Sequence, residues 1–290
     1  MKNPVTQAAI AIPVILLVAM AIAWSASPGS DIAWGWPVFA LCGVFAFAVN
    51  WLVFVPSFLG QTERYFDATG SLTYLGLLAL ALVATEGRDA RAWLLAAMVA
   101  AWAVRLGSFL FRRIREDGSD GRFDSIKPSF VRFLMAWTLQ GLWVFLTLSC
   151  ALAAMTSAEK VPLGGWALLG GFLWATGFVL EVVADNQKRA FRSDPSNRDR
   201  FITSGLWAWS RHPNYVGEIT LWVGVAMVAF PALSGGQYLT LISPVFVFVL
   251  LTRISGIAMV ERRGMRKWGD DPEYRAYLER TPALFPIGRG

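Results

Sequence analysis

The chain has 290 residues and a net charge of +6, and only 16% of its residues are charged while 56% are hydrophobic. A soluble domain of this size would need more charged residues to cover its surface, so the composition excludes a soluble enzyme. The basic balance is not a nucleic-acid signal, because the Lys and Arg residues lie in loops between long apolar runs. The sequence therefore predicts an all-α integral membrane protein, a transmembrane helical bundle with seven to eight spans.

Eight apolar segments follow one another along the chain. They cover residues 8–25, 34–57, 71–85, 92–111, 131–155, 164–184, 216–232 and 238–260. A helix needs about 20 residues to cross the hydrocarbon layer, and the third and seventh segments are the shortest. No polar linker is long enough to separate two folded units, so residues 1–290 are predicted to form a single membrane domain.

The charges of the loops predict how the segments cross the membrane. The loops that are rich in Lys and Arg are 112–130, 186–215 and the tail after residue 260. The loops that are poor in these residues are 26–33, 156–163 and 233–237, and in loop 86–91 Arg88 and Arg91 are balanced by Glu86 and Asp89. With eight crossings, the basic loops and both termini fall on one side. This side is the cytoplasm by the positive-inside rule.

Cysteine and histidine usage limits the chemistry. Cys42 and Cys150 both lie in apolar runs and are interpreted as packed thiols. His212 is the single histidine of the chain. A site with several histidine ligands is therefore excluded, and no metal is predicted.

The sixth segment ends in a stripe of charged residues. Glu181, Asp185, Arg189 and Arg192 follow at spacings of four, four and three, and these spacings place them on one helical face. One interpretation is a self-paired ladder at the membrane interface. The other is the floor of a pocket for a polar ligand, in which Arg189 and Arg192 reach phosphates. The stripe by itself leaves both open.

A second polar group follows the loop after this stripe. Pro213 is suited to the first position of a helix, where its missing N–H costs nothing, and Asn214 and Glu218 would share a face of that helix. A helix N-terminus beside Arg211 and His212 can hold an anion. Alternatively, Asn214 caps the helix, Glu218 neutralises an arginine and His212 is structural.

These motifs carry a resemblance to a known family. They are Asp185-Asn186-Gln187-Lys188, Gly205-Leu206-Trp207, Arg211-His212-Pro213-Asn214-Tyr215-Val216-Gly217-Glu218, Glu261-Arg262-Arg263 and Asp271-Pro272-Glu273-Tyr274-Arg275-Ala276-Tyr277. Together they resemble the steroid 5α-reductase superfamily, and its bacterial members most closely, over about residues 100–290. The segment from Arg211 to Glu218 is similar also to isoprenylcysteine carboxyl methyltransferases, which use it for S-adenosylmethionine.

The resemblance implies NADPH-dependent reduction of the conjugated C=C bond of an enone lipid, such as a 3-oxo-Δ4-steroid, to the 5α-dihydro product. By position, Arg105, Asp185, Arg189, Arg192, Arg200, Asn214 and Glu218 match residues that hold the dinucleotide in the reductases. Asn186, Trp207, Arg211, His212, Tyr215 and Glu261 belong to the same motifs and are assigned to the same cofactor site. No G-x-G-x-x-G motif follows a strand, so NADPH would be bound without a Rossmann fold.

Such a reduction needs a donor to the ketone. Hydride addition to the β-carbon builds negative charge on the ketone oxygen, and a proton donor must meet that oxygen. The animal enzymes use a glutamate and a tyrosine on early helices, whereas this chain has Trp102 where the tyrosine is expected. We assign the catalytic role to Tyr65 and Asp67, at the predicted cytoplasmic mouth of the third segment. The alternative is an interfacial tyrosine next to a solvated acid.

The expected architecture places the substrate-side helices in residues 1–115 and the cofactor-binding helices and loops in residues 116–290. The expected partners are a hydrophobic steroid-like or other enone lipid and membrane lipids, without nucleic acid. A monomer is compatible with the sequence, which does not fix the oligomeric state. The expected location is a bacterial inner membrane with both termini and the cofactor site in the cytoplasm.

Two other functions compete with this one. The first is a methyltransferase that uses S-adenosylmethionine on a membrane-embedded substrate. Because S-adenosylmethionine carries no phosphate, the clustered arginines argue against it. The second is a non-catalytic protein that binds or transports lipids, in which the charged stripe would form salt bridges at the interface.

Overall fold

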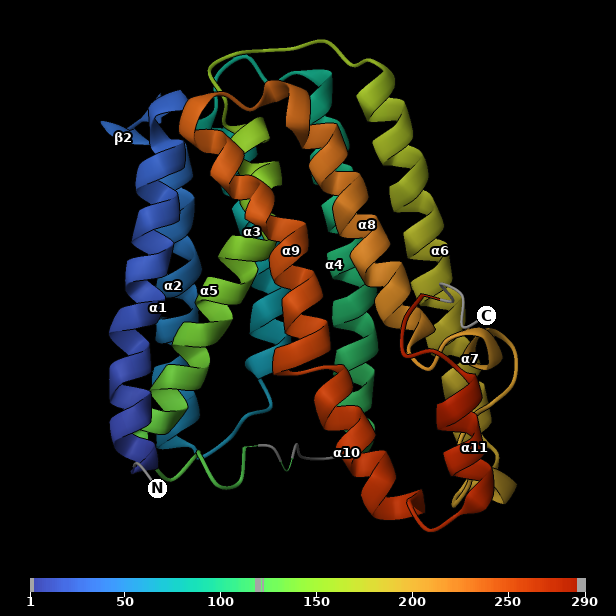
Figure 1. Cartoon of the computed structure of the whole chain (residues 1–290). Coiled ribbons are helices and arrows are strands. Elements are labelled where there is room, and N and C mark those ends of the chain that lie inside the picture. Colours follow the sequence, from blue (N-terminus) through green and yellow to red (C-terminus); the bar gives the residue numbers. More distant parts are fainter. Residues whose placement is uncertain (1–2, 118–120, 122, 286–290) are drawn as a thin grey trace. The chain divides into compact units, whose positions relative to one another are not determined.

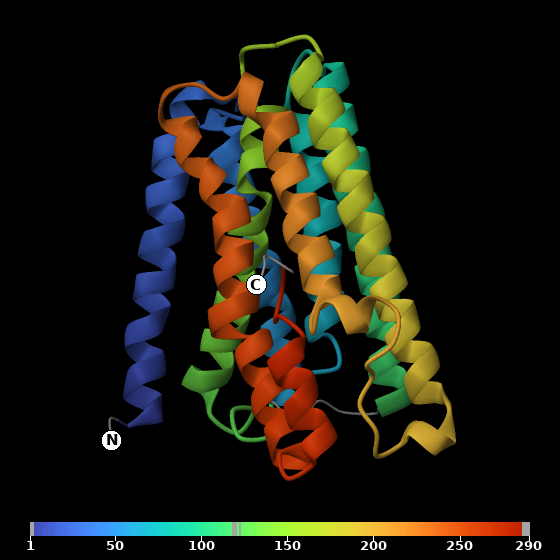
Figure 2. The same ribbon diagram turned by 45° about the vertical axis from the view of Figure 1, so that its right-hand side comes forward.

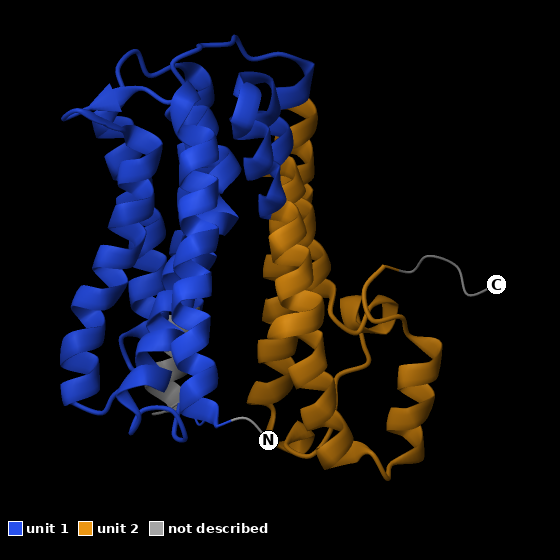
Figure 3. Ribbon diagram, turned by 60° about the vertical axis from the view of Figure 1, so that its left-hand side comes forward, with its two compact units in different colours: residues 1–167, 226–243 blue, residues 168–225, 244–290 orange. Residues whose placement is uncertain are grey.

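A computed structural model describes residues 3–117, 121 and 123–285, so the predicted basic loop 112–130 and tail lie partly outside the described residues. Within this part of the chain, eight helices are long and apolar enough to cross a membrane. This confirms the predicted all-α membrane fold. The chain forms two compact units, Met1–Ala167 with Ala226–Ser243 and Leu168–Val225 with Pro244–Gly290 (Figure 3). The predicted single domain, with its division near residue 115, is not tested by these units and stays a prediction.

Unit 1 is built around a buried central helix. Its elements are α1 (Pro4–Ala26), η1 (Ser27–Gly29), β1 (Ile32–Ala33), β2 (Trp36–Pro37), α2 (Val38–Leu59), α3 (Phe66–Ala84), α4 (Ala90–Asp117), α5 (Phe130–Met155), η3 (Phe230–Ala232) and η4 (Gly235–Leu241). Helix α5 contacts α1, α2, α3 and α4 (Figure 1). Small residues permit this close packing: a Cβ atom on Gly141 would lie 3.0 Å from the Phe47 ring. The position therefore tolerates little beyond glycine.

The second predicted segment begins later than expected. The sequence predicted an apolar run over 34–57, whereas α2 begins at Val38 because a two-stranded hairpin precedes it. Ala33 pairs with Trp36, and the two residues between them, Trp34 and Gly35, have positive φ angles of 51° and 78°. Such angles are those of a tight hairpin turn, in which glycine is the favoured second residue.

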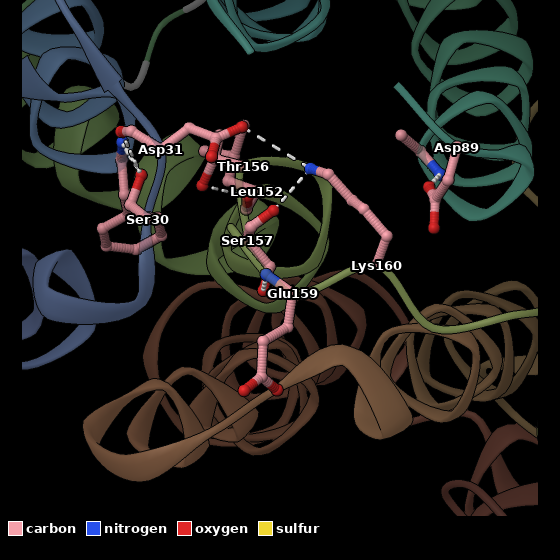
Figure 4. A network of polar contacts seen from close by, with 10 residues as sticks. Ser30, Asp31, Asp89, Leu152, Thr156, Ser157, Glu159 and Lys160 are labelled. Atoms are coloured by element: carbon pink, nitrogen blue, oxygen red, sulfur yellow. Dashed lines mark hydrogen bonds and ion pairs between the residues drawn. The ribbon is translucent and has the colours of Figure 1, made fainter. Parts of the chain in front are cut away.

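A polar network joins this hairpin to the end of α5 (Figure 4). The Asp31 N–H donates to the Thr156 carbonyl at 2.7 Å, and the Ala158 N–H donates to the Gly29 carbonyl at 3.0 Å. The Lys160 ammonium lies 3.5 Å from the Asp31 carboxylate and donates to the Ser157 carbonyl at 2.5 Å. The network satisfies backbone groups at the end of α5, which would otherwise lose hydrogen bonds as the helix ends.

Arg91 donates hydrogen bonds to backbone carbonyls near the C-terminal end of α8, which η3 follows. Its side chain is 1% exposed, and its guanidinium donates to the carbonyls of Val228 and Pro162, the latter at 2.8 Å. The sequence counted Arg91 among the loop charges that set the topology. In the structure it lies in the first turn of α4 and serves the backbone instead. An arginine is suited to this because it presents several donors in one plane.

Unit 2 contains the long polar end of the sixth span. Its elements are α6 (Gly165–Ser193), η2 (Pro195–Asn197), α7 (Leu206–Trp209), α8 (Pro213–Ala229), α9 (Ile242–Val249), η5 (Leu250–Ile254), α10 (Ile257–Trp268) and α11 (Pro272–Arg280). The first residues of α6 and α9 and the last of α8 belong to unit 1. Helix α8 begins at Pro213, as the sequence predicted. Helix α6 continues well beyond the predicted residue 184.

Helices α6 and α8 touch through glycines and lie side by side in Figures 1 and 2. A Cβ atom on Gly217 would lie 2.6 Å from both the Glu181 nitrogen and the Gly177 carbonyl oxygen. A Cβ atom on Gly224 would lie 2.5 Å from the Gly170 carbonyl oxygen. Small residues at such spacings allow two membrane helices to approach at backbone distance. The glycine of the Asn214–Glu218 motif is thus explained by packing.

The eighth predicted segment, 238–260, is not one regular helix. It passes through the 3₁₀ helix η4, the α-helix α9 and the π-helix η5, and then breaks before α10. A Cβ atom on Gly256 would lie 2.1 Å from the Leu251 carbonyl oxygen, so a larger residue would not fit this break. Helix α10, which contains Glu261 of the candidate site, begins directly after this break.

Candidate functional site

The polar end of α6 holds the loop that precedes α8. The Gln187 side-chain oxygen accepts a hydrogen bond from the Leu206 N–H at 2.9 Å. Gly205 has a φ of +61°, and a Cβ atom there would lie 2.7 Å from this same oxygen. The Trp207 indole N–H donates to the Ala184 carbonyl at 3.0 Å. These contacts fix α7 against α6, and they place the Lys188 ammonium 4.4 Å from the centre of the Trp207 ring.

Arg211 is bound on several sides by the protein. Its backbone N–H donates to the Pro282 carbonyl at 2.9 Å, and its guanidinium donates to the Leu278 carbonyl at 3.0 Å. A further guanidinium nitrogen lies 3.0 Å from the Glu261 carboxylate. Arg211 therefore ties α8's leading loop to α10 and to the C-terminal segment.

His212 shares the same carboxylate. Its Nε2 lies 3.4 Å from Glu261 Oε1. Its ring stacks on that of Tyr215, with 5.3 Å between the ring centres and an angle of 7° between the ring planes. Burial lowers the pKa of His212 below its ordinary value, and the neighbouring Glu261 opposes this shift only in part. The imidazole is therefore neutral at pH 7.

Aromatic residues of the C-terminal segment complete the site. The centre of the Phe201 ring lies 4.9 Å from the ring centre of Tyr274, 5.9 Å from that of Tyr277 and 5.8 Å from that of Trp268. The Tyr277 hydroxyl donates to the Trp207 carbonyl at 2.7 Å, and burial raises the pKa of Tyr277 to about 12. This tyrosine thus remains a hydrogen-bond donor throughout the neutral range.

These elements of unit 2 enclose a cavity of about 650 Å³, including its open mouth. It is lined by Lys188, Phe191, Arg192, Arg200, Phe201, Ile202, Trp207, Arg211, His212, Val260, Glu261, Gly264, Trp268, Tyr274, Tyr277 and Leu278. Four of these side chains are cationic and one is a carboxylate, which leaves an excess of three positive charges. A larger hollow of about 1200 Å³ shares Phe191, Arg200 and Phe201 with it.

The structure brings six of the predicted cofactor residues together in this wall. They are Arg192, Arg200, Trp207, Arg211, His212 and Glu261. Six others lie in the same unit, on α6 and at the start of α8, but do not line the cavity: Asp185, Asn186, Arg189, Asn214, Tyr215 and Glu218. Of these, Asn214 has a buried side-chain oxygen that accepts no hydrogen bond within the described residues.

The remaining predicted residues lie in unit 1. Arg105 is a half-buried residue of α4, with its guanidinium 5.8 Å from the Phe109 ring centre. Tyr65 directly precedes α3 and is 56% exposed. Asp67 lies half-buried in the first turn of α3. The catalytic role of Tyr65 and Asp67 and the cofactor role of Arg105 stay predictions.

The sequence did not assign Lys188 or the aromatic wall to the site. Lys188 stood in a quoted motif of which only Asp185 and Asn186 were assigned to the cofactor, and Tyr274 and Tyr277 stood in another motif that was not assigned to it. A usable signal existed in α11, because two tyrosines three residues apart share one face of a helix. Both are buried in a helix that also contains four charged residues, which indicates one face packed against a partner.

Comparisons with known proteins agree with the motifs. The chain is 25% identical over 226 residues to an uncharacterized protein of Schizosaccharomyces pombe, covering 68% of this chain and 63% of that protein. It is 35% identical over 118 residues to the probable O-methyltransferase ustE of Ustilaginoidea virens, covering 35% of this chain and 39% of that protein. The chain thus spans less than two thirds of the length of these relatives. No solved structure matches the chain.

The family model described as "protein of unknown function (DUF1295)" matches residues 53–281. The match includes parts of both units and every residue of the cavity wall. The chain therefore belongs to the DUF1295 family, a steroid 5α-reductase-like family.

Proposed function

We propose that the protein is an NADPH-dependent oxidoreductase that reduces the conjugated C=C bond of an enone lipid, with a 3-oxo-Δ4-steroid as the model substrate. The observation that carries this proposal is the charge of the cavity in unit 2. Lys188, Arg192 and Arg200 are in excess over the single carboxylate Glu261, which is already paired with Arg211. Such a wall fits a ligand with several phosphates.

The residues of the cavity fit the parts of this dinucleotide. Lys188, Arg192 and Arg200 would hold its phosphates, and Phe201, Trp207 and Tyr277 offer flat faces for its ring systems. The Glu261 carboxylate can accept a hydrogen bond from a ribose hydroxyl. When bound, NADPH supplies a hydride for the β-carbon of the enone.

The protein would supply the donor at the carbonyl. The reduction adds a hydride to the β-carbon and a proton to the α-carbon, and negative charge passes through the ketone oxygen between these steps. In our proposal the Tyr65 hydroxyl donates to that oxygen, and the Asp67 carboxylate orients the phenol. If Tyr65→Phe and Asp67→Asn each left turnover intact with NADPH still bound, this assignment would be wrong.

A direct assay tests the reaction. Detergent-purified protein is mixed with a 3-oxo-Δ4-steroid and NADPH that carries deuterium at the transferred position. We expect loss of absorbance at the NADPH band and deuterium at C5 of a 5α-dihydro product. Folded protein that binds NADPH and reduces no steroid, quinone or other enone would contradict the proposal.

A second candidate is an S-adenosylmethionine-dependent O-methyltransferase. The observation that favours it is the similarity to ustE, whose name describes a probable O-methyltransferase. The cavity argues against it, since S-adenosylmethionine offers one carboxylate and no phosphate to three cationic side chains. Transfer of a labelled methyl group to a lipid extract, with no effect of NADPH, would favour this candidate. A protein that binds neither cofactor would instead fit lipid binding or transport.

A further inference from the structure

The four cationic side chains of the cavity differ in the hydrogen-bond and ion-pair partners that the protein provides for them. Arg211 donates to the Leu278 carbonyl and pairs with Glu261, so its positive charge is already balanced by a carboxylate of the protein. Lys188 meets no hydrogen-bond acceptor among the described residues, and its close partner is the face of the Trp207 ring at 4.4 Å. The two residues therefore have different tasks, although one cavity contains both.

The Trp207 ring determines the position of the Lys188 ammonium. Trp207 is 3% exposed and is held at both ends, because its indole N–H donates to the Ala184 carbonyl and its own carbonyl accepts from the Tyr277 hydroxyl. A ring fixed in this way holds an ammonium group over its face by cation–π attraction. Among residues 3–117, 121 and 123–285, the three N–H groups of Lys188 then have no acceptor within hydrogen-bond distance.

Depth in the cavity separates Lys188 from the two arginines that remain. Arg192 and Arg200 are exposed, and Arg200 also lines the neighbouring hollow, whereas Lys188 is half-buried. The Asp185 carboxylate on the same helix attracts the Lys188 ammonium. A half-buried cation with no hydrogen-bond acceptor among the described residues still gains from an anion that accepts its N–H groups, and water screens such a pair less than a pair at the surface. This combination indicates that an anionic ligand group completes the site at Lys188.

We propose that Lys188 is an anion-binding residue that takes the pyrophosphate of the dinucleotide over the Trp207 ring, while Arg211 is a positioning residue that holds Glu261 and the C-terminal segment. This inference rests on the proposed function. It differs from the assignment from the sequence, which gave the binding role to Arg211 and none to Lys188. The exposed Arg192 and Arg200 then serve the outer part of the ligand.

The test uses full-length protein in detergent, with inorganic pyrophosphate, NADPH and NADH as probes in thermal-shift and equilibrium binding experiments. The variants are Lys188→Gln and Lys188→Arg. The matched control is Arg266→Gln, which removes one exposed charge of α10 outside the cavity wall. We expect pyrophosphate to stabilise the wild type, Lys188→Arg and Arg266→Gln but not Lys188→Gln. NADPH and NADH should both bind Lys188→Gln about tenfold or more weakly, because one charged hydrogen bond is lost.

Arg211→Gln separates the two tasks. Without any ligand it should lower the melting temperature by several degrees, whereas Lys188→Gln should leave it nearly unchanged or raise it. Unchanged pyrophosphate binding in Lys188→Gln, or a loss confined to NADPH over NADH, would overturn the inference and leave the NADPH proposal standing. If the wild type binds no NADPH, the proposed function fails, but the pyrophosphate comparison still decides the role of Lys188.

Discussion

His212 lies in the wall of the candidate site, yet its contacts give it a supporting task. Its ring stacks on Tyr215 and its Nε2 faces a carboxylate that Arg211 also holds. A neutral imidazole can donate one hydrogen bond to Glu261 and thereby fix the direction of that carboxylate. The residue thus belongs to the frame that presents Glu261 to the cavity.

This arrangement predicts a pH dependence of stability. Burial holds the pKa of His212 below its unfolded value of about 6.5, so the unfolded chain binds the proton more readily. Stability is therefore retained above about pH 6.5 and is lost as the pH falls from there towards the folded-state pKa. We expect the melting temperature of the wild type to fall between pH 7.5 and 5.5, and His212→Gln to show a smaller fall. Since His212 is the only histidine, equal falls would contradict this.

The residues of the site show what a sequence can and cannot predict. Arg192, Arg200 and Glu261 were assigned to one site because they stand in motifs that resemble those of a known family, and in the structure they line one cavity. The contact of Phe201 with Tyr274 depends on how α11 folds back, and no local pattern specifies it. Lys188 was overlooked for a related reason, since its partner Trp207 comes from a different helix.

At the scale of elements, glycine contacts between α6 and α8 determine where Glu181 and the Asn214–Glu218 motif lie. Gly217→Ala would place a methyl group 2.6 Å from the backbone of α6, and one helix must then move. We expect the free energy of unfolding to fall by about 1–3 kcal/mol, as for other overpacked cores. A lower melting temperature would show this fall.

Gly171 provides the matched control for this change. It lies on α6 as well, and a Cβ atom there would meet nothing within 4 Å. Gly171→Ala should be neutral or stabilising, because alanine is the better helix former. If both substitutions had the same effect, the close approach of α6 and α8 would not be what Gly217 provides.

The buried cap by Arg91 leads to a prediction for α4 and the end of α8. Arg91→Met would leave the Val228 and Pro162 carbonyls without their donor, at a cost on the order of 3 kcal/mol. We expect a markedly shorter half-life of the folded protein at a fixed elevated temperature. Arg88→Met removes an exposed charge from the loop before α4 and should leave the half-life unchanged. Similar half-lives for the two variants would show that the cap contributes little.

The elements themselves were largely predictable, because eight apolar runs of sufficient length have few alternatives to helices in a membrane. The exceptions are local. The hairpin before α2 depends on positive φ angles at Trp34 and Gly35, and a Trp-Gly pair is not a strong turn signal. The break before α10 depends on Gly256, which in an apolar sequence is read as a packing residue.

In the whole molecule, binding of cytoplasmic NADPH requires the loops that border the cavity to lie in the cytoplasm. The structure carries a convenient test, because Cys42 and Cys150 are both buried. In intact bacterial cells expressing the protein, a membrane-impermeant thiol reagent should label Glu159→Cys and not Ser196→Cys, although both positions are exposed. After the cells are opened, both should react. The reverse pattern would contradict the topology predicted from the loop charges.

We propose above that the cavity in unit 2 binds a phosphate-rich dinucleotide. The decisive measurement is the dissociation constants of NADPH and S-adenosylmethionine for one preparation of wild-type protein in detergent, obtained by calorimetry. An excess of three positive charges in the wall predicts that NADPH binds at least tenfold more tightly and that added salt weakens its binding. Tight binding of S-adenosylmethionine with no heat from NADPH would show that the cavity does not bind a dinucleotide.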